Sequence, residues 1–413
     1  MGFGSKLKSK NTETAAQIAN AARPIAMAGY NADNISGVTP VAPLTTGGLN
    51  EVLELRAEAC TSVNNATTLG HLKKPDIPRH NDASRAEVNA LVVDKMWRIV
   101  CVNKLQAFYT QESLQACINR ACMHDYRLLM REWNIPTIDM ACDIAVLGLF
   151  DIAFIGDDSG SMARTETAED GMTRWELLKI LVRTLSFWAT LMDDDGVVVR
   201  LFNNDVGDMG NCVASQSDVE ALFASVPDPS ITRYTTPMGA RIDEILQDIV
   251  YPMMDANDLP KPVLMLVITD GKADDEDRVF DAINGCRSKA KRSNYGAHAV
   301  SFGFCQVGTD SEAQDWLDMI DKHRKIGHLV DCTSNYQMES AECLQNYGVE
   351  LSPAAYLVKA LIGAVDPTYD EMDGKDDAQA SSSTSTANAS DVLPSYSAAT
   401  TGYDRSGNRS HRR

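Results

Sequence analysis

The sequence is poor in basic residues, which excludes several classes of partner. Of 413 residues, 38 are Lys or Arg and 57 are Asp or Glu, so the formal net charge is -19. Nucleic-acid binding depends on basic clusters that neutralise phosphates, and adsorption to anionic lipid needs the same clusters. We therefore expect no nucleic-acid partner and no stable membrane anchoring.

Long hydrophobic runs are also missing. Residues 1–22 are polar and contain no apolar block of the kind found in a secretory signal peptide. The longest apolar stretch, residues 135–156, is interrupted by Asp139, Asp143 and Asp151, which excludes a membrane-spanning helix. These absences predict a cytoplasmic protein.

The ten cysteines form no Cys-x-x-Cys pair, which argues against a zinc knuckle or a thioredoxin-like site. Most of them lie in apolar runs, as Cys101 does between Val100 and Val102. A free cysteine in such a run behaves as a small hydrophobic residue. We therefore expect free thiols and a reducing compartment.

Hydrophobic spacing divides the chain into four segments. Residues 1–82 are polar, with small residues and no sustained periodicity, and we expect a largely disordered arm and connector. Apolar side chains recur at helical spacing over 83–149, which predicts a helical extension. Residues 150–365 alternate short apolar strands with amphipathic helices and end in one further helix. Acidic and then Ser/Thr-rich composition predicts a disordered tail over 366–413.

The alternating segment predicts an α/β fold. Strands are expected at 151–156, 197–202, 263–268, 297–304 and 327–331. Helices are expected near 172–192, 216–224, 238–254, 275–292, 311–321 and 353–364. This alternation implies a Rossmann-like, doubly wound and mainly parallel sheet with helices on both faces.

Three segments place oxygen-bearing side chains where strands end. Asp157, Ser159 and Ser161 follow the first apolar strand as Asp-x-Ser-x-Ser, Thr236 opens a helix in Thr-Pro-Met-Gly, and Asp270 ends the strongest strand in Thr-Asp-Gly. Ligands of doubly wound sheets bind at the carboxyl ends of strands, where the topology switches. Two carboxylates and three hydroxyls suit a hard cation, Mg²⁺ or Mn²⁺, and leave a coordination position for an outside ligand.

These three segments resemble the metal-ion-dependent adhesion site of von Willebrand factor A (VWA) domains, and the resemblance covers about 150–335. It implies that Ser159, Ser161 and Thr236 coordinate the metal directly and that Asp157 and Asp270 act directly or through water. It also implies a protein partner whose Asp or Glu completes the metal's shell. The function expected from the resemblance is divalent-metal-dependent protein binding.

A closer resemblance extends this to about 100–367. The segments 105–151 and 357–367 look like those of an uncharacterised group of intracellular eukaryotic VWA proteins, mostly fungal or protist, which place a helical segment before the domain. This resemblance implies an architecture and no known activity.

Several acidic residues depart from, or add to, the family pattern. Asp158 fills a position that is often apolar, and Asp274, Asp275 and Glu276 add charge near the rim of the expected site. Such charges either strengthen cation capture or repel an acidic partner. The turn 193–196, Asp-Asp-Asp-Gly, is interpreted as a solvated connection, with a second cation site as the alternative.

A phosphatase is one alternative to metal-dependent binding. A haloacid-dehalogenase-type phosphatase needs Asp-x-Asp, and Ser159 stands at the second acidic position. None of the three loops contains a histidine to serve as a base, so we expect no enzyme. Two alternatives stay open. One is an adaptor subunit of an AAA-type ATPase assembly, with the motor on another chain because this one has no nucleotide-binding Gly-Lys loop. The other is a structural VWA scaffold with no metal-dependent ligand.

Overall fold

A computed structural model describes residues 81–165, 172–193, 195–232, 234–347 and 351–369. The arm and connector expected over 1–82 lie almost wholly outside these residues, and so does most of the tail expected over 366–413.

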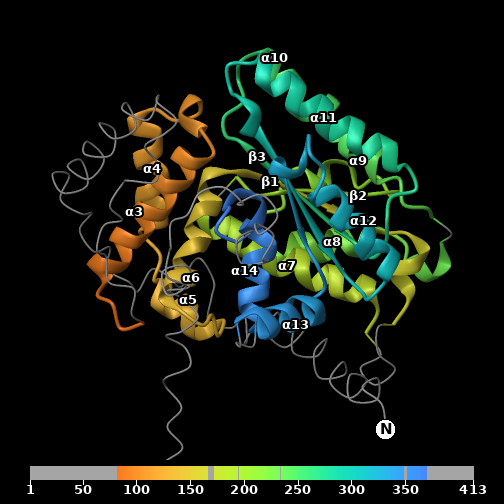
Figure 1. Cartoon of the computed structure of the whole chain (residues 1–413), viewed down its shortest axis with the longest axis horizontal. Coiled ribbons are helices and arrows are strands. Elements are labelled where there is room, and N and C mark those ends of the chain that lie inside the picture. Colours follow the sequence, from red (N-terminus) through yellow and green to blue (C-terminus); the bar gives the residue numbers. More distant parts are fainter. Residues whose placement is uncertain (1–80, 166–171, 194, 233, 348–350, 370–413) are drawn as a thin grey trace, which may run out of the picture.

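A five-stranded, fully parallel sheet forms the centre of the molecule (Figure 1). Its strands are β1 (Asp151–Gly156), β2 (Val198–Leu201), β3 (Val263–Thr269), β4 (Val300–Gln306) and β5 (Val330–Thr333). Their order is β2-β1-β3-β4-β5. The expected α/β, doubly wound class is therefore confirmed at the level of a parallel sheet wrapped by helices.

Helices follow each strand, as the alternation predicted, and one of them, α13 (Tyr336–Tyr347), was not expected. They are α7 (Arg174–Met192), α8 (Gln216–Ser225), α9 (Met238–Ile245), α10 (Tyr251–Asp255), α11 (Glu276–Arg292), α12 (Ser311–Asp321), α13 (Tyr336–Tyr347) and α14 (Pro353–Ile362). A π-helical turn, Leu246–Val250, separates α9 from α10, where one continuous helix was expected. Pro252 follows this turn and has no N–H to donate to the preceding turn, which accounts for the local change in hydrogen bonding.

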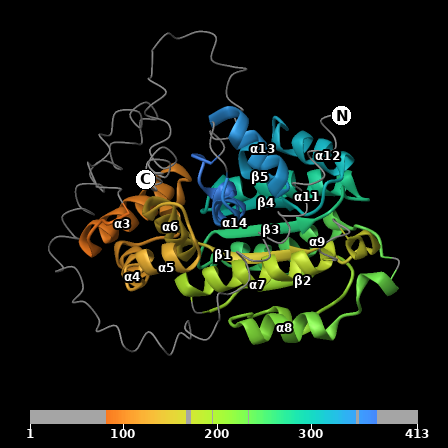
Figure 2. The ribbon, with the colours of Figure 1, turned by 90° about the horizontal axis from the view of Figure 1, so that it is seen from below.

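The two faces of the sheet bury different sets of apolar side chains. Phe154 faces a core that includes residues of α7 and α14, whereas its neighbour Ile155 faces a core formed with α9, α11 and α12. This alternation follows from the period of two in a strand. Figure 2 shows α7 and α8 on the side of the sheet away from α12.

A helical group precedes β1 and shares the first of these cores. It contains α3 (Arg85–Val102), α4 (Gln111–Ala121), α5 (Tyr126–Glu132), α6 (Ile138–Asp143) and a 3-10 segment, Ile144–Leu149. Ser84 and Glu87 form a capping box that begins α3. The group lies to one side of the sheet in both views (Figures 1 and 2). Phe108 stacks on Tyr295, just before β4, so the group packs near the amino ends of the strands.

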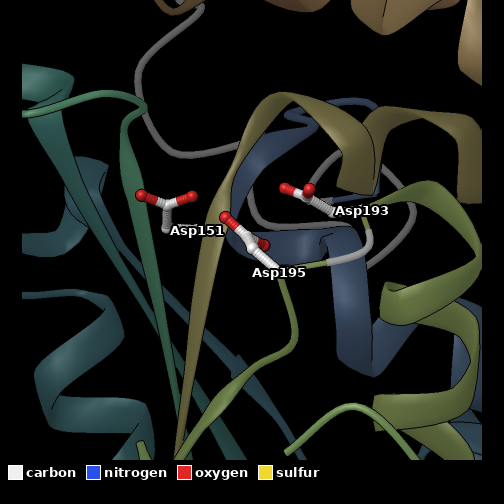
Figure 3. A group of neighbouring side chains, drawn as sticks. All are labelled: Asp151, Asp193 and Asp195. Carbon is white, nitrogen blue, oxygen red and sulfur yellow. The ribbon is translucent and has the colours of Figure 1, made fainter. Parts of the chain in front are cut away.

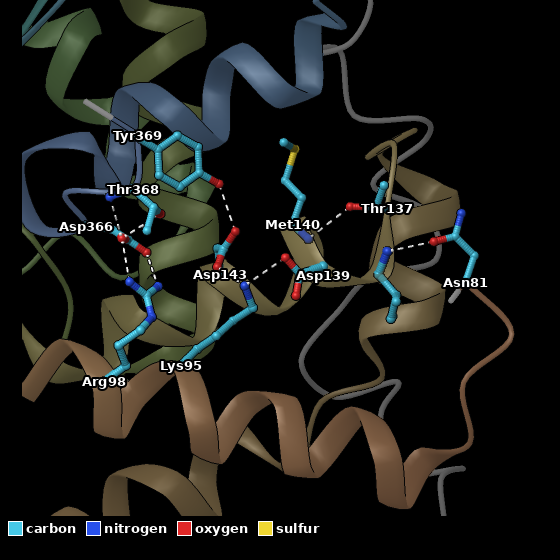
Figure 4. Close-up of polar contacts among 11 residues, drawn as sticks. Asn81, Lys95, Arg98, Thr137, Asp139, Met140, Asp143, Asp366, Thr368 and Tyr369 are labelled. Atoms are coloured by element: carbon cyan, nitrogen blue, oxygen red, sulfur yellow. Dashed lines mark hydrogen bonds and ion pairs between the residues drawn. The ribbon is translucent and has the colours of Figure 1, made fainter. Parts of the chain in front are cut away.

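The last described residues form hydrogen bonds with this helical group (Figure 4). Arg98 of α3 donates two hydrogen bonds to the fully buried carboxylate of Asp366, at 2.9 and 2.5 Å. The hydroxyl of Tyr369 donates to Asp143 at 2.8 Å, and Lys95 pairs with the same carboxylate. We expected the tail to begin at residue 366, and the packed chain instead extends through Tyr369.

Two expectations concern thiols and membranes. Six cysteines in the described part of the chain have free thiols, as expected: Cys117, Cys122, Cys142, Cys212, Cys286 and Cys305. In that same part, no helix combines the length and the apolar character that crossing a bilayer requires.

Candidate metal centre

The predicted site lies where the chain changes direction across the sheet. β1 continues through α7 to β2 on one side, and its neighbour on the other side, β3, continues to β4. Gly156 is in register with Ile268, so Asp157 and Thr269 follow as neighbours at the carboxyl ends of the two strands. The backbone N–H of Asp157 donates to the carbonyl oxygen of Ile268 at 2.9 Å, which holds the first loop against β3. This is the position at which doubly wound sheets bind ligands.

Both serines meet Asp270 in one chain of hydrogen bonds. The Oγ atoms of Ser159 and Ser161 are 2.9 Å apart, and Ser161 Oγ donates to Oδ1 of Asp270 at 2.8 Å. Ser161 and Asp270 come from loops that are 109 residues apart in sequence. Sequence reasoning predicted that these two loops meet, and the structure brings them into direct contact.

Asp157 is fully buried behind the serines. Its Oδ1 accepts from the backbone N–H of Ser159 at 2.8 Å, and its Oδ2 accepts from the hydroxyl of Thr269 at 2.6 Å. Burial and the nearby charge of Asp270 raise the pKa of Asp157 to about 7. The carboxylate is thus fixed in place, and its negative charge is incompletely compensated.

Thr236 is joined to the site through its backbone. Its N–H donates to Oδ2 of Asp274 at 2.7 Å, and the N–H of Asp274 donates back to the Thr236 carbonyl oxygen at 3.0 Å. The N–H of Gly160 donates to the carbonyl oxygen of Tyr234 at 3.3 Å, so the Thr236 loop contacts both other loops. Among the residues that the structure describes, the Thr236 hydroxyl forms no hydrogen bond with the other four predicted ligands.

Both carboxylate oxygens of Asp158 accept hydrogen bonds from the loop after β2. Its Oδ1 accepts from the backbone and side-chain amides of Asn203, at 2.9 and 2.8 Å. Its Oδ2 accepts in the same way from Asn204, at 2.9 and 2.6 Å. The Asn203 side chain also donates to the carbonyl oxygen of Thr235 at 2.9 Å. Asp158 therefore ties the serine loop to the loop after β2 and, through Asn203, to the Thr236 loop.

The expected rim charges are also engaged with the chain itself. Oδ1 and Oδ2 of Asp275 accept from the backbone N–H groups of Gly239 and Ala240, at 2.9 and 2.7 Å, in the first turn of α9. Asp274 holds the Thr236 loop, as described above, and Glu276 pairs with Lys272 at 2.9 Å. Local contacts within the chain therefore set the positions of these carboxylates, in addition to the charge that the sequence predicted near the rim.

Arg174 is the site residue that sequence reasoning missed. This first residue of α7 is mostly buried, and its Nη1 donates to Oδ2 of Asp270 at 2.6 Å. The first turn of a helix carries the positive end of the helix dipole, which disfavours a cation there. A basic residue directly after the Thr173 cap was therefore a signal that a carboxylate lies close by.

The donor set can be tested against the chemistry of Mg²⁺. The side chains of the five predicted ligands offer oxygen atoms and neither nitrogen nor sulfur. Mg²⁺ holds oxygens at 2.0–2.1 Å in an octahedron, which puts neighbouring ligands about 2.9 Å apart. The spacings from Ser159 Oγ to Ser161 Oγ and from Ser161 Oγ to Asp270 Oδ1 are 2.9 and 2.8 Å. Ordinary hydrogen bonds have the same length, so these two spacings are compatible with such an ion, and the all-oxygen donor set fits its chemistry.

A second acidic group lies at the amino end of β1 (Figure 3). Carboxylate oxygens of Asp151, Asp193 and Asp195 lie within 4.8 Å of one another. Burial raises the pKa of Asp151 to about 6, and the Lys261 ammonium forms an ion pair with Asp193. The turn expected over 193–196 thus brings two carboxylates to Asp151, and a lysine of the chain already supplies positive charge there.

Comparison with known proteins gives no independent assignment. No family model matches the chain, and a search of curated proteins returned no significant match. The three loops, with their position in the sheet and the contacts among them, are the features that point to a function.

Proposed function

We propose that this chain is a VWA-type protein-binding module that depends on a divalent cation, Mg²⁺ or Mn²⁺. Asp157, Ser159, Ser161, Thr236 and Asp270 hold the cation, and an Asp or Glu side chain of a protein partner completes its shell. The observation that carries the proposal is the chain of close oxygens from Ser159 through Ser161 to Asp270 at the switch point between β1 and β3.

Each residue of the site has a separate role in holding a cation. Ser159 and Ser161 present hydroxyl oxygens, and the contact of Ser161 with Asp270 leaves lone pairs on its oxygen for a cation. Asp157, fully buried, orients the first loop through the backbone of Ser159 and contributes negative charge. Thr236 brings a third hydroxyl on a loop that Asp274 holds in place.

Bound at this site, the cation supplies a positive charge and a ligand position that an outside carboxylate fills. Two of the protein oxygens around it, in Asp157 and Asp270, belong to side chains that are no more than 2% exposed. Low solvent exposure strengthens attraction between charges. A partner carboxylate that reaches the site therefore has a stronger electrostatic attraction to the cation than it would have at an exposed surface.

A second candidate function is a structural scaffold that needs no cation. The Arg174–Asp270 ion pair favours this candidate, because it compensates a buried carboxylate with a side chain of the protein itself. Under the scaffold hypothesis, replacing ligands changes stability alone and leaves Mg²⁺ without effect.

Thermal melting of the full chain separates the two candidates. Wild type is melted in EDTA and then in millimolar Mg²⁺, beside Asp157→Ala and Ser161→Ala. The second variant removes a ligand while keeping both carboxylates, in case Asp157→Ala fails to fold. Asp248→Ala serves as the control, since Asp248 is an exposed acid on the π-helical turn after α9.

A ligand that binds only the folded state raises the melting temperature by mass action. We expect a Mg²⁺-dependent rise in wild type and in Asp248→Ala, and none in the two site variants. An equal rise in all four proteins would place the cation elsewhere and overturn the proposal. No rise in wild type would favour the scaffold.

A further inference from the structure

The Arg174–Asp270 contact has a consequence for how the site takes up a cation. Arg174 places a permanent positive charge on one oxygen of a predicted ligand, and Ser161 occupies the other oxygen. The side chains of Arg174 and Asp270 are 10% and 1% exposed, so solvent screens the pair little. Asp270 therefore offers an incoming cation less negative charge than its carboxylate alone would supply.

We infer that Arg174 is a built-in counter-ion that competes with the divalent cation for Asp270 and thereby makes cation uptake depend on an acidic partner. This inference rests on the proposed function and adds the regulation of the same site. The partner group is a carboxylate, because its negative charge offsets the repulsion between the Arg174 guanidinium and the divalent cation.

With Arg174 present, a divalent cation meets a site in which one of the two acidic ligands, Asp270, is already paired with a positive charge, so the affinity for the cation in the absence of an anion is low. Once the cation is bound, the site carries one more unit of positive charge than it would with a neutral side chain at position 174. An outside carboxylate removes that excess, and the guanidinium can donate to it as well as to Asp270 because it has five N–H groups.

The geometry of α7 supports a lasting role for Arg174. Thr173 and Glu176 form a capping box that fixes the start of the helix, and the neighbouring Trp175 is buried against Phe223. Arg174 is thus attached to a rigid element. A cation can weaken the ion pair of Arg174 with Asp270, but the guanidinium stays close to Asp270 and remains available to an anion.

The test is isothermal titration of MgCl₂ into the full chain, first in sodium chloride and then in sodium acetate at the same ionic strength. Acetate stands in for the partner's carboxylate. Arg174→Gln keeps a hydrogen-bond donor and removes the charge, whereas Arg174→Lys keeps the charge. Arg183→Gln removes a positive charge from the same helix at a residue that forms no ion pair within the described part of the chain.

In chloride, we expect Arg174→Gln to bind Mg²⁺ about tenfold more tightly than wild type, because a unit charge a few ångströms from a divalent ion matters even at the dielectric constant of water. Acetate should tighten Mg²⁺ binding by wild type and by Arg174→Lys, and should do so much less for Arg174→Gln. Arg183→Gln should match wild type in both salts.

The outcomes separate this inference from the proposed function. If wild type binds Mg²⁺ and Arg174→Gln binds it no more tightly, the counter-ion role is wrong and the metal site stands. If Arg174→Gln binds Mg²⁺ and wild type does not, competition between Arg174 and the cation for Asp270 is supported, and the native chain is a structural scaffold that takes up no cation. If neither protein binds, both proposals are overturned.

Discussion

The hydroxyl of Thr269, the last residue of β3, donates to Oδ2 of Asp157, the first residue after β1, at 2.6 Å. The hydroxyl oxygen of Thr269 also accepts from the backbone N–H of Gly271 at 3.2 Å. One side chain therefore positions a buried carboxylate on one strand and shapes the turn that carries Asp270 on the next.

Replacing Thr269 with valine keeps the shape of the side chain and removes the hydroxyl. We expect Thr269→Val to lower the free energy of unfolding by about 1–3 kcal/mol, because a buried carboxylate oxygen loses its donor. Urea denaturation measures the loss. Thr269→Ser retains the hydroxyl and should stay within about 1 kcal/mol of wild type. A valine variant as stable as the serine variant would show that the contact contributes little.

Removing Arg174 should also change stability in a way that depends on metal. In EDTA, Arg174→Gln should lower the free energy of unfolding by about 2–4 kcal/mol, because the buried carboxylate of Asp270 loses the guanidinium that compensates its charge. Saturating Mg²⁺ should restore part of this loss. Urea denaturation with and without Mg²⁺ provides the measurement, and Arg183→Gln is the control. Identical losses in both solutions would mean that Mg²⁺ does not reach Asp270.

Asp158 should matter to stability and to cation affinity through the loops that it joins. Asp158→Ala leaves four donors of Asn203 and Asn204 without their acceptor, and we expect a loss of about 2–4 kcal/mol in the free energy of unfolding. Mg²⁺ affinity should fall as well, since the loops around the serines lose their tether. Asp208→Ala, at an exposed loop position, should change neither. Unchanged Mg²⁺ affinity in Asp158→Ala would limit Asp158 to a role in stability.

The pair His298 and His328 predicts a pH dependence of stability. Burial and the neighbouring His328 lower the pKa of His298 to about 4, and the two rings are 6.1 Å apart between centroids. The unfolded chain takes up a proton near pH 6.5, and the folded chain does not until about pH 4. The stability associated with His298 is therefore complete above pH 6.5 and is lost as the pH falls toward 4.

His298→Gln should remove about 1–2 kcal/mol of this pH-dependent change, a value discounted for the partial exposure of the ring. Thermal melting at pH 7.5 and pH 4.5 gives the comparison. His328→Gln should give an intermediate slope, because it removes only the neighbour's contribution. Equal slopes in wild type and His298→Gln would show that other groups account for acid sensitivity.

The Arg98–Asp366 pair should stabilise the whole described structure. The pKa of Asp366 is held below its usual range by the hydrogen bonds and charge of Arg98, although burial alone would raise it. Asp366→Ala leaves Arg98 without its bidentate partner, and we expect a loss of about 3 kcal/mol or more in the free energy of unfolding. Guanidinium denaturation is the measurement, and Asp248→Ala is the control. A loss no larger than in the control would show that solvent replaces the pair.

The contacts among Asp157, Ser159, Ser161 and Asp270 were predictable because carboxyl ends of adjacent parallel strands meet at one edge. A strongly apolar strand precedes each of the two aspartates, which fixes where the loops begin. The role of Arg174 could not be read in the same way, because the approach of a helix's first turn to a loop depends on the packing of the whole helix.

Other differences between the predictions from the sequence and the structure also have local causes. Asp274 and Asp275 look like free surface charge in the sequence, but backbone N–H groups of loops far along the chain use them as acceptors. The helix α13 was not expected, because its residues are mostly polar and lack a clear apolar stripe. Asp366 lies in an acidic stretch that resembles a tail, and its partner Arg98 is 268 residues away.

That separation matters while the protein is being made. Ribosomes add about 5–20 residues per second, so Asp366 emerges roughly 15 to 50 seconds after Arg98, given the 268 residues between them. During that time α3 lacks the residues that fasten it, and the apolar side chains of Met96 and Ile99, which end fully buried, depend on incomplete packing or on chaperones for protection. Packing of α3 therefore depends on the last described residues, because a chain interrupted before Asp366 lacks the partner of Arg98.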